Sequence, residues 1–280
     1  MKTHPSTSSS LRPSRLTVRG GLLARSARGL SLVEATIILA TVSILSAILA
    51  PTISGYIDQA RIARAREDVR VIGDAINTFI DDNGEKVFLQ DGVGAAALNP
   101  PANRRDNGGT SYRVNLLVSD GDVPTGAAGV TDVAFWLQAV SATFVQTLSD
   151  HLIENQPNDT TANRYRNPND VTTASTGGNI DFARTESSGF NAPYAWRGAY
   201  LKSPVNADPW GNRYAVNVGF LDPSPTIAIA NISTAVANYP RMDVFVISAG
   251  GDEEIDTTPE QDGAVPGDDD IIYVVSSNAK

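Results

Sequence analysis

The chain of 280 residues contains no cysteine, so no disulfide framework can stabilise any part of it. Histidine is almost as scarce, because only His4 and His151 occur. A zinc site or a histidine-based catalytic dyad beyond the N-terminal segment would therefore depend on His151 alone. We interpret His151 as an ordinary surface or semi-buried residue and expect that the protein is not an enzyme. A tethered hydrolase that uses Asp and Ser residues is a less favoured alternative for the same reason.

Acidic residues are missing from one end of the chain. Residues 1–29 hold six basic and no acidic residues, whereas residues 30–280 hold 16 basic and 31 acidic ones. A basic segment that precedes an apolar span stays on the cytoplasmic side of a membrane, so we expect the acidic part to be exported. An acidic domain lacks the Lys and Arg clusters that phosphate contacts need, which argues against a nucleic-acid partner.

The apolar stretch from Leu30 to Ala50 contains a single charged residue, Glu34. About 20 such residues suffice to span a bilayer. A carboxylate within the span costs roughly 2.5–3.5 kcal/mol on an insertion scale, and such a charge usually has a function and a partner. A cut after Gly29 would create that partner, an α-amine on Leu30. A simple signal anchor is the alternative, but it explains neither Glu34 nor Gly29.

Helical periodicity continues beyond Pro51 with one apolar face and charged residues around it. The pattern predicts one helix from Leu30 to about Asp82, with Pro51 and Gly55 weakening it at the joint between an all-apolar half and an amphipathic half. The apolar face consists of Val69, Ile72, Ile76, Phe79 and Ile80.

The remaining sequence favours loops first and strands afterwards. We expect a strand at 112–118 and a second helix at about 131–154 inside a loop-rich insertion. Short β-branched segments bounded by turn residues predict the later strands, at 213–220, 226–232, 243–248 and 271–276. This order predicts an α+β fold with a small antiparallel sheet packed on the apolar face of the helix. The expected divisions are 1–29, 30–52, 53–84, 85–196 and 197–280.

The segment Gly29-Leu30-Ser31-Leu32-Val33-Glu34, followed by an apolar helix with Pro51, resembles the class III signal of type IV pilins and type II secretion pseudopilins. The resemblance implies a pilin-like fold and a leader of residues 1–29 that a prepilin peptidase removes after Gly29. It also implies N-methylation of Leu30 and roles for Glu34 and Pro51 in assembly of a fibre.

Two later motifs narrow the resemblance to the major pseudopilin. The first is the turn Asp208-Pro209-Trp210-Gly211-Asn212, which sequence chemistry alone explains as a structural turn. The second combines Ser248–Asp252 with Asp268-Asp269-Asp270-Ile271, and the resemblance implies that Asp252, Asp269 and Asp270 bind calcium. Residues 251–270 hold nine acidic and no basic residues, a composition that suits a cation bound by oxygen ligands. A solvated acidic loop is the alternative.

The function implied by the resemblance is structural. The chain would be a single-pass inner-membrane protein with a periplasmic C-terminal domain, and it would polymerise with itself into a periplasmic fibre for protein transport by a type II secretion system. Implied partners are minor pseudopilins, the prepilin peptidase, an inner-membrane platform protein, a cytoplasmic ATPase and secreted substrates. The alternatives are a type IV pilin of a surface fibre for adhesion, motility or DNA uptake, and a monomeric membrane-anchored periplasmic binding protein.

Overall fold

The computed structural model describes most of the chain from Leu30 to Ser276. The described residues are 30–83, 86, 88–91, 105–106, 111–140, 144–157, 165, 180–181, 196–221, 229, 231–233 and 235–276. The chain divides into two compact units, Met1–Thr52 and Ile53–Lys280. Gly29, the expected end of the leader, and most of the strand expected at 226–232 lie outside the described residues.

The long helix α1 (Leu32–Asn83) confirms the helix expected from the apolar periodicity and contains Pro51. Ser31 caps its N-terminus, because the Ser31 Oγ accepts a hydrogen bond from the Glu34 backbone N–H at 3.2 Å. A hydroxyl at this position satisfies one of the free N–H groups of the first turn. Among the described residues, α1 is the one helix long and apolar enough to cross a membrane, which fits a membrane anchor or a signal sequence.

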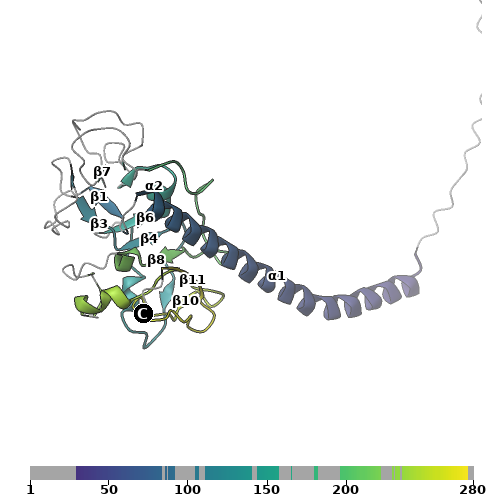
Figure 1. Cartoon of the computed structure of the whole chain (residues 1–280). Helices are drawn as coiled ribbons and strands as arrows, with labels where there is room; N and C mark the ends of the chain where they lie inside the picture. The colour runs from purple at the N-terminus through teal and green to yellow at the C-terminus, as the bar shows by residue number, and fades with distance from the viewer. Residues whose placement is uncertain are drawn as a thin grey trace, which may run out of the picture. The chain divides into compact units, whose positions relative to one another are not determined.

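The part of α1 within the second unit buries one stripe of side chains and lies alongside the strands in Figure 1. The stripe recurs every three to four residues, as one face of an α-helix requires. Four of its members, Val69, Ile72, Ile76 and Phe79, were expected from the sequence, and Ile80 is half-buried. The full buried set is Ala65, Val69, Ile72, Gly73, Ala75, Ile76, Phe79 and Asn83.

A five-stranded sheet in the order β11-β9-β8-β4-β6 packs against this stripe. Its strands are β4 (Leu116–Val118), β6 (Val145–Thr147), β8 (Ala215–Val216), β9 (Val244–Ser248) and β11 (Ile271–Ser276). All five residues of β9 are buried, as a central strand requires. The predicted strands at 243–248 and 271–276 are therefore confirmed.

The sheet is mixed, so the expectation of an antiparallel sheet is wrong at one edge. Three strand pairs are antiparallel, but β4 pairs with β6 in parallel. A parallel pair needs a long crossover, and residues 119–144 separate β4 from β6 along the chain. Both strands come from the segment expected to be an insertion, so 85–196 contributes to the same sheet as the C-terminal region.

The second helix expected at 131–154 is wrong. The segment instead forms the 3₁₀ helix η1 (Val133–Phe135), strand β6 and the short helix α2 (Leu148–Leu152). Asp132 and Phe144 have positive φ angles of 55° and 72°, which interrupt a right-handed helix. Thr147 ends the strand and begins α2, because its hydroxyl accepts from the Asp150 backbone N–H at 3.2 Å.

The remaining elements are short and surround this framework. The predicted strand at 112–118 is split into β3 and β4, and the one at 213–220 becomes β8 followed by the 3₁₀ helix η3. The bounds are β1 (Leu89–Asp91), β2 (Arg105–Asp106), β3 (Ser111–Arg113), β5 (Thr125–Gly126), β7 (Ile180–Asp181), η3 (Val218–Leu221), η4 (Val236–Arg241) and β10 (Glu254–Ile255).

The end of α1 rests on an aromatic cluster that contains His151. Phe79 stacks on Phe88 with ring centroids 4.4 Å apart and meets the edge of Tyr165 at 5.0 Å. The His151 side chain is fully buried, contrary to the surface or semi-buried position expected, and its Nδ1 lies 2.6 Å from the Tyr165 hydroxyl. Burial lowers the pKa of His151 to about 3, so the imidazole is neutral. Among the described residues its Nε2 has no hydrogen-bond partner.

Candidate cation site

The acidic loop, defined here as residues 249–270, connects the two strands β9 and β11 at one end of the sheet. Gly250, its second residue, has a φ of 73°, a conformation that L side chains rarely adopt. A Cβ at Gly250 would also overlap the carbonyl and carboxylate of Asp269. Glycine is therefore required where the two ends of the loop approach each other.

The Asp208 turn fixes the entry to the acidic loop. Asp208 Oδ1 accepts hydrogen bonds from the backbone N–H groups of Trp210, Gly211 and Asn212 at 2.9–3.0 Å. Asp208 Oδ2 accepts from the Ser248 hydroxyl at 2.7 Å, and Ser248 is the last residue of β9. The Asp208 turn and the acidic loop, which the sequence presents as two separate motifs, are thus joined by a buried carboxylate.

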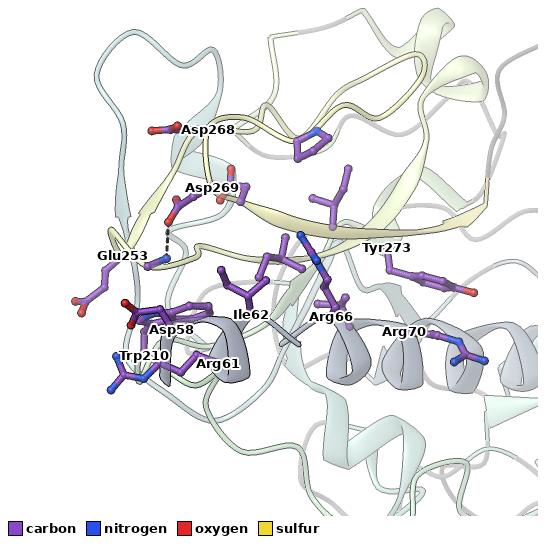
Figure 2. A pocket seen from close by; sticks show the side chains of 16 residues that line it. Asp58, Arg61, Ile62, Arg66, Arg70, Trp210, Glu253, Asp268, Asp269 and Tyr273 are labelled. Atoms are coloured by element: carbon purple, nitrogen blue, oxygen red, sulfur yellow. Dashed lines mark hydrogen bonds between the residues drawn. The ribbon is translucent and has the colours of Figure 1, made fainter. Parts of the chain in front are cut away.

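Asp269 closes the loop on itself. Its Oδ2 accepts from the backbone N–H groups of Gly251 at 2.6 Å and Asp252 at 3.2 Å, and Figure 2 shows the first of these bonds. Partial burial raises the pKa of Asp269, the Gly251 bond opposes that rise, and the nearby Asp252 carboxylate adds to it. Two carboxylates therefore approach each other closely enough to repel.

Asp270 is the buried acid of the loop, with 6% of its surface exposed. Its Oδ2 accepts from the Thr257 hydroxyl at 2.6 Å and from the Asp256 backbone N–H at 2.9 Å. Its Oδ1 is buried and has no hydrogen-bond partner among the described residues. Burial raises the pKa of Asp270 to about 7. A buried carboxylate oxygen without a donor is a position where a cation would be stabilising.

Three other carboxylates form the closest cluster. Oxygens of Asp252, Asp256 and Asp268 all lie within 4.8 Å of one another, with Asp256 half-buried and the other two exposed. Burial raises the pKa of Asp256, and the charges of Asp252 and Asp268 raise it further. Such mutual repulsion is relieved when a cation lies between the carboxylates.

The sequence-based ligand set is thus brought together only in part. Asp252 belongs to the carboxylate cluster, whereas Asp269 and Asp270 use one oxygen each to hold backbone groups of the loop. Sequence reasoning missed Asp256 and Asp268, although Asp268 is the first of three consecutive aspartates. The donors are all oxygens, which fits a hard cation such as Ca²⁺ or Mg²⁺ rather than a thiolate- or imidazole-preferring metal.

A groove of about 940 Å³ lies between the acidic loop and α1. Figure 2 shows arginines of α1 along one side and Asp268 and Asp269 on the other. Arg70 pairs with Glu67 at 3.5 Å, but no ion pair joins Arg61 or Arg66 to another described residue. The groove therefore offers both signs of charge beside apolar side chains.

Of the predicted N-terminal site residues, Leu30 and Glu34 lie at the start of α1, Pro51 lies farther along it, and Gly29 is outside the described residues. Leu30 and Glu34 are exposed, and Glu34 is the acidic residue of the first turn. Pro51 lies within the helix. The cap between Ser31 and the Glu34 backbone N–H is a local signal that sequence reasoning missed, although Ser is a favoured N-cap residue.

Comparison with protein-family models, curated proteins and solved structures returned no match for this chain. The long apolar N-terminal helix and the α+β architecture agree with the resemblance seen in the sequence at the level of general shape alone. The functional assignment therefore depends on the motifs and on the physical properties of the two regions described above.

Proposed function

We propose that this chain is a structural fibre subunit, the major pseudopilin of a type II secretion system, and that it polymerises through the N-terminal half of α1. The observation that carries the proposal is the division of one helix into two chemically different halves. Residues 30–52 contain one charge and are exposed, whereas residues 53–83 bury a stripe against their own domain. An exposed all-apolar helix needs lipid or other copies of itself around it.

Local hydrogen bonds support this role for the apolar half. The hydroxyls of Thr36, Thr41 and Ser43 donate to carbonyls three or four residues earlier in the helix, at 2.8–2.9 Å. Hydroxyls satisfied in this way need no partner from water, so they are tolerated in a bilayer or a fibre core. Glu34 is the one charged residue in residues 30–52, and its carboxylate still requires a partner from outside the helix.

The first experiment is mass spectrometry of the N-terminus of the membrane-extracted protein. We expect a mature chain that begins at Leu30 with a methylated α-amine. A mature N-terminus at Met1, or at any residue after Ala50, would contradict the proposal. An intact or differently cut chain that forms no polymer would favour the membrane-anchored binding protein, and fibres on the cell surface would favour a surface pilin.

The second experiment tests the role of Glu34. Glu34→Ala removes the carboxylate that would meet the α-amine of a neighbouring copy, and we expect it to insert in the membrane but to assemble poorly. Ser31→Ala is the matched control, because it removes the N-cap hydroxyl and leaves the carboxylate. Loss of fibres from Ser31→Ala alone would assign assembly to the N-cap hydroxyl, and a normal fibre yield from Glu34→Ala would contradict the role given to its carboxylate.

We further propose that the acidic loop binds a calcium ion through Asp252, Asp256 and Asp268, with Asp270 holding the backbone N–H of Asp256. The cation would offset the repulsion of the nine acidic residues between 251 and 270 and stabilise a domain without disulfides. A site with a Kd on the order of 10⁻⁴–10⁻³ M would add about 0.4–1.4 kcal/mol at millimolar Ca²⁺.

Thermal unfolding of the detergent-solubilised full chain, with Ca²⁺ or with chelator, tests the calcium proposal. Asp256→Asn should abolish the difference in Tm between the two conditions. Asp262→Asn removes the same charge from an exposed position in the same loop outside the cluster and should preserve the difference. A wild-type Tm that is the same with Ca²⁺ and with chelator would show that the acidic loop is a solvated loop without a bound cation.

A further inference from the structure

Residues 120–138, a segment outside the family motifs, hold the acidic loop through backbone and side-chain hydrogen bonds. Strand β5 pairs in parallel with β10, which lies inside the loop. The backbone N–H groups of Thr125 and Ala127 donate to the carbonyls of Glu253 at 3.0 Å and Ile255 at 3.1 Å. Half of the loop is therefore anchored to a segment more than a hundred residues earlier in the chain.

Trp136 makes the second connection. Its ring is fully buried, and its indole Nε1–H donates to the Thr257 carbonyl at 2.9 Å. The backbone of Trp136 is itself fixed, because Arg213 Nη2 donates to the carbonyls of Trp136 and Gln138, both at 2.6 Å. Arg213 is 3% exposed and lies two residues before β8, so the contact reaches from the central sheet to the acidic loop.

Thr257 transmits this contact to the buried acid. Its hydroxyl donates to Asp270 Oδ2 at 2.6 Å and accepts from the Gly267 backbone N–H at 2.9 Å. Thr257 is fully buried, so the position of its backbone decides the direction of that hydroxyl. Two hydrogen bonds, both made by Thr257, thus connect Trp136 to the Asp270 carboxylate. The other oxygen of that carboxylate has no donor among the described residues.

We infer that Trp136 is a positioning residue for the cation site and that residues 120–138 serve to hold the acidic loop in its cation-binding arrangement. The inference rests on the proposed binding of calcium by the loop. A loop of repelling carboxylates loses affinity when its ligands must be ordered at the moment of binding, and fixing them beforehand reduces that loss. The indole N–H and the Thr257 hydroxyl supply this fixation on the side away from solvent.

Core packing is the competing explanation for Trp136. Its ring lies 5.3 Å from the ring of Phe135 and 5.5 Å from that of Phe245. A purely packing role predicts that changes at Trp136 alter the Tm by the same amount with and without cation. A positioning role predicts that removal of the indole N–H weakens Ca²⁺ binding itself.

The test is calorimetric titration of Ca²⁺ into the detergent-solubilised full chain. Trp136→Phe removes the N–H and should weaken Ca²⁺ binding roughly three- to tenfold, the effect of one net hydrogen bond. Trp196→Phe is the matched control, because its indole N–H also donates to a backbone carbonyl, that of His151 at 3.4 Å. Its affinity for Ca²⁺ should equal that of the wild type.

Should Trp136→Phe fail to fold, a tryptophan analogue in which sulfur replaces the indole N–H keeps the ring shape and is introduced at 136 and, separately, at 196. Unchanged affinity at 136, with either a lower or an equal Tm, would overturn the inference and leave the calcium proposal standing. A wild type that binds no Ca²⁺ would overturn both. The fibre proposal would survive either result, since N-terminal processing and assembly are measured separately.

Discussion

The two halves of α1 differ in what they need from their surroundings. Residues 30–52 contain one charged residue and residues 53–83 contain ten. The second half buries its apolar stripe within its own domain, whereas the apolar side chains of the first half are exposed on every side. One continuous helix therefore combines a segment that is satisfied by intramolecular packing with a segment that requires lipid or other chains.

The largest expected effect on stability separates the two halves directly. Phe79 is fully buried against Phe88, Tyr165 and Tyr200, and Phe79→Ala should destabilise the domain by about 3–5 kcal/mol. Leu39 is 71% exposed, and Leu39→Ala should leave the unfolding free energy of the same domain unchanged. Denaturant unfolding of the detergent-solubilised full chain measures the effect of each variant. Equal losses of unfolding free energy would contradict the difference between the two halves.

The sequence predicts the helix well because its apolar residues recur at 3–4 spacing and Glu34 stands alone in the first half. It also predicts β9 and β11, which are rich in Val and Ile and each follow an aspartate. It fails at 131–154, where Val145, Leu148 and Leu152 recur at helical spacing although Val145 is in a strand. The pairing of that strand with β4 is a long-range contact, which no local pattern contains.

The candidate site shows the same limit. Composition identifies the acidic loop, but the choice among its nine acidic residues depends on how the loop folds back. Asp256 enters the carboxylate cluster because β10, just before it, pairs with β5, and Asp270 is buried under Thr257. The partners in these contacts, β5 and Thr257, carry no sequence signal that links them to the acidic residues. The choice of candidate ligands therefore could not be predicted from the sequence.

A smaller effect is the pH dependence of the unfolding free energy, which also distinguishes the two halves of α1. The second half ends beside His151, whereas the first half contains no titratable residue other than Glu34. The folded pKa of His151 is lowered to about 3 by burial, while the unfolded value is 6.5. The folded state favours the neutral imidazole. The stability that depends on a neutral His151 is therefore fully present above pH 6.5 and is lost as the pH falls towards 3. At pH 5 the loss is about 2 kcal/mol.

The raised pKa of Asp270 acts in the opposite direction, since a buried acid favours the folded state as it becomes protonated below about pH 7. The measurement is therefore the difference in unfolding free energy between wild type and His151→Gln, followed from pH 7.5 to 5 in saturating Ca²⁺. We expect the advantage of the wild type to shrink as the pH falls. An advantage that stays constant would contradict a neutral, desolvated His151.

The smallest effect compares two glycines of α1 at which substitution by alanine should change stability in opposite directions. Nothing lies within 4 Å of a Cβ placed at Gly55, so Gly55→Ala should stabilise the helix by about 0.8–1.0 kcal/mol through its higher helix propensity. A Cβ at Gly73 would overlap the ring of Tyr273, whose hydroxyl donates to Asp74 at 2.8 Å. Gly73→Ala must displace that ring and should destabilise by about 1 kcal/mol despite the same gain in propensity.

The double variant Gly73→Ala, Tyr273→Ala removes the obstacle, so the glycine-to-alanine change should turn favourable in that background. If Gly73→Ala is as stabilising as Gly55→Ala in the wild-type background, the contact between α1 and β11 is looser than the structure indicates.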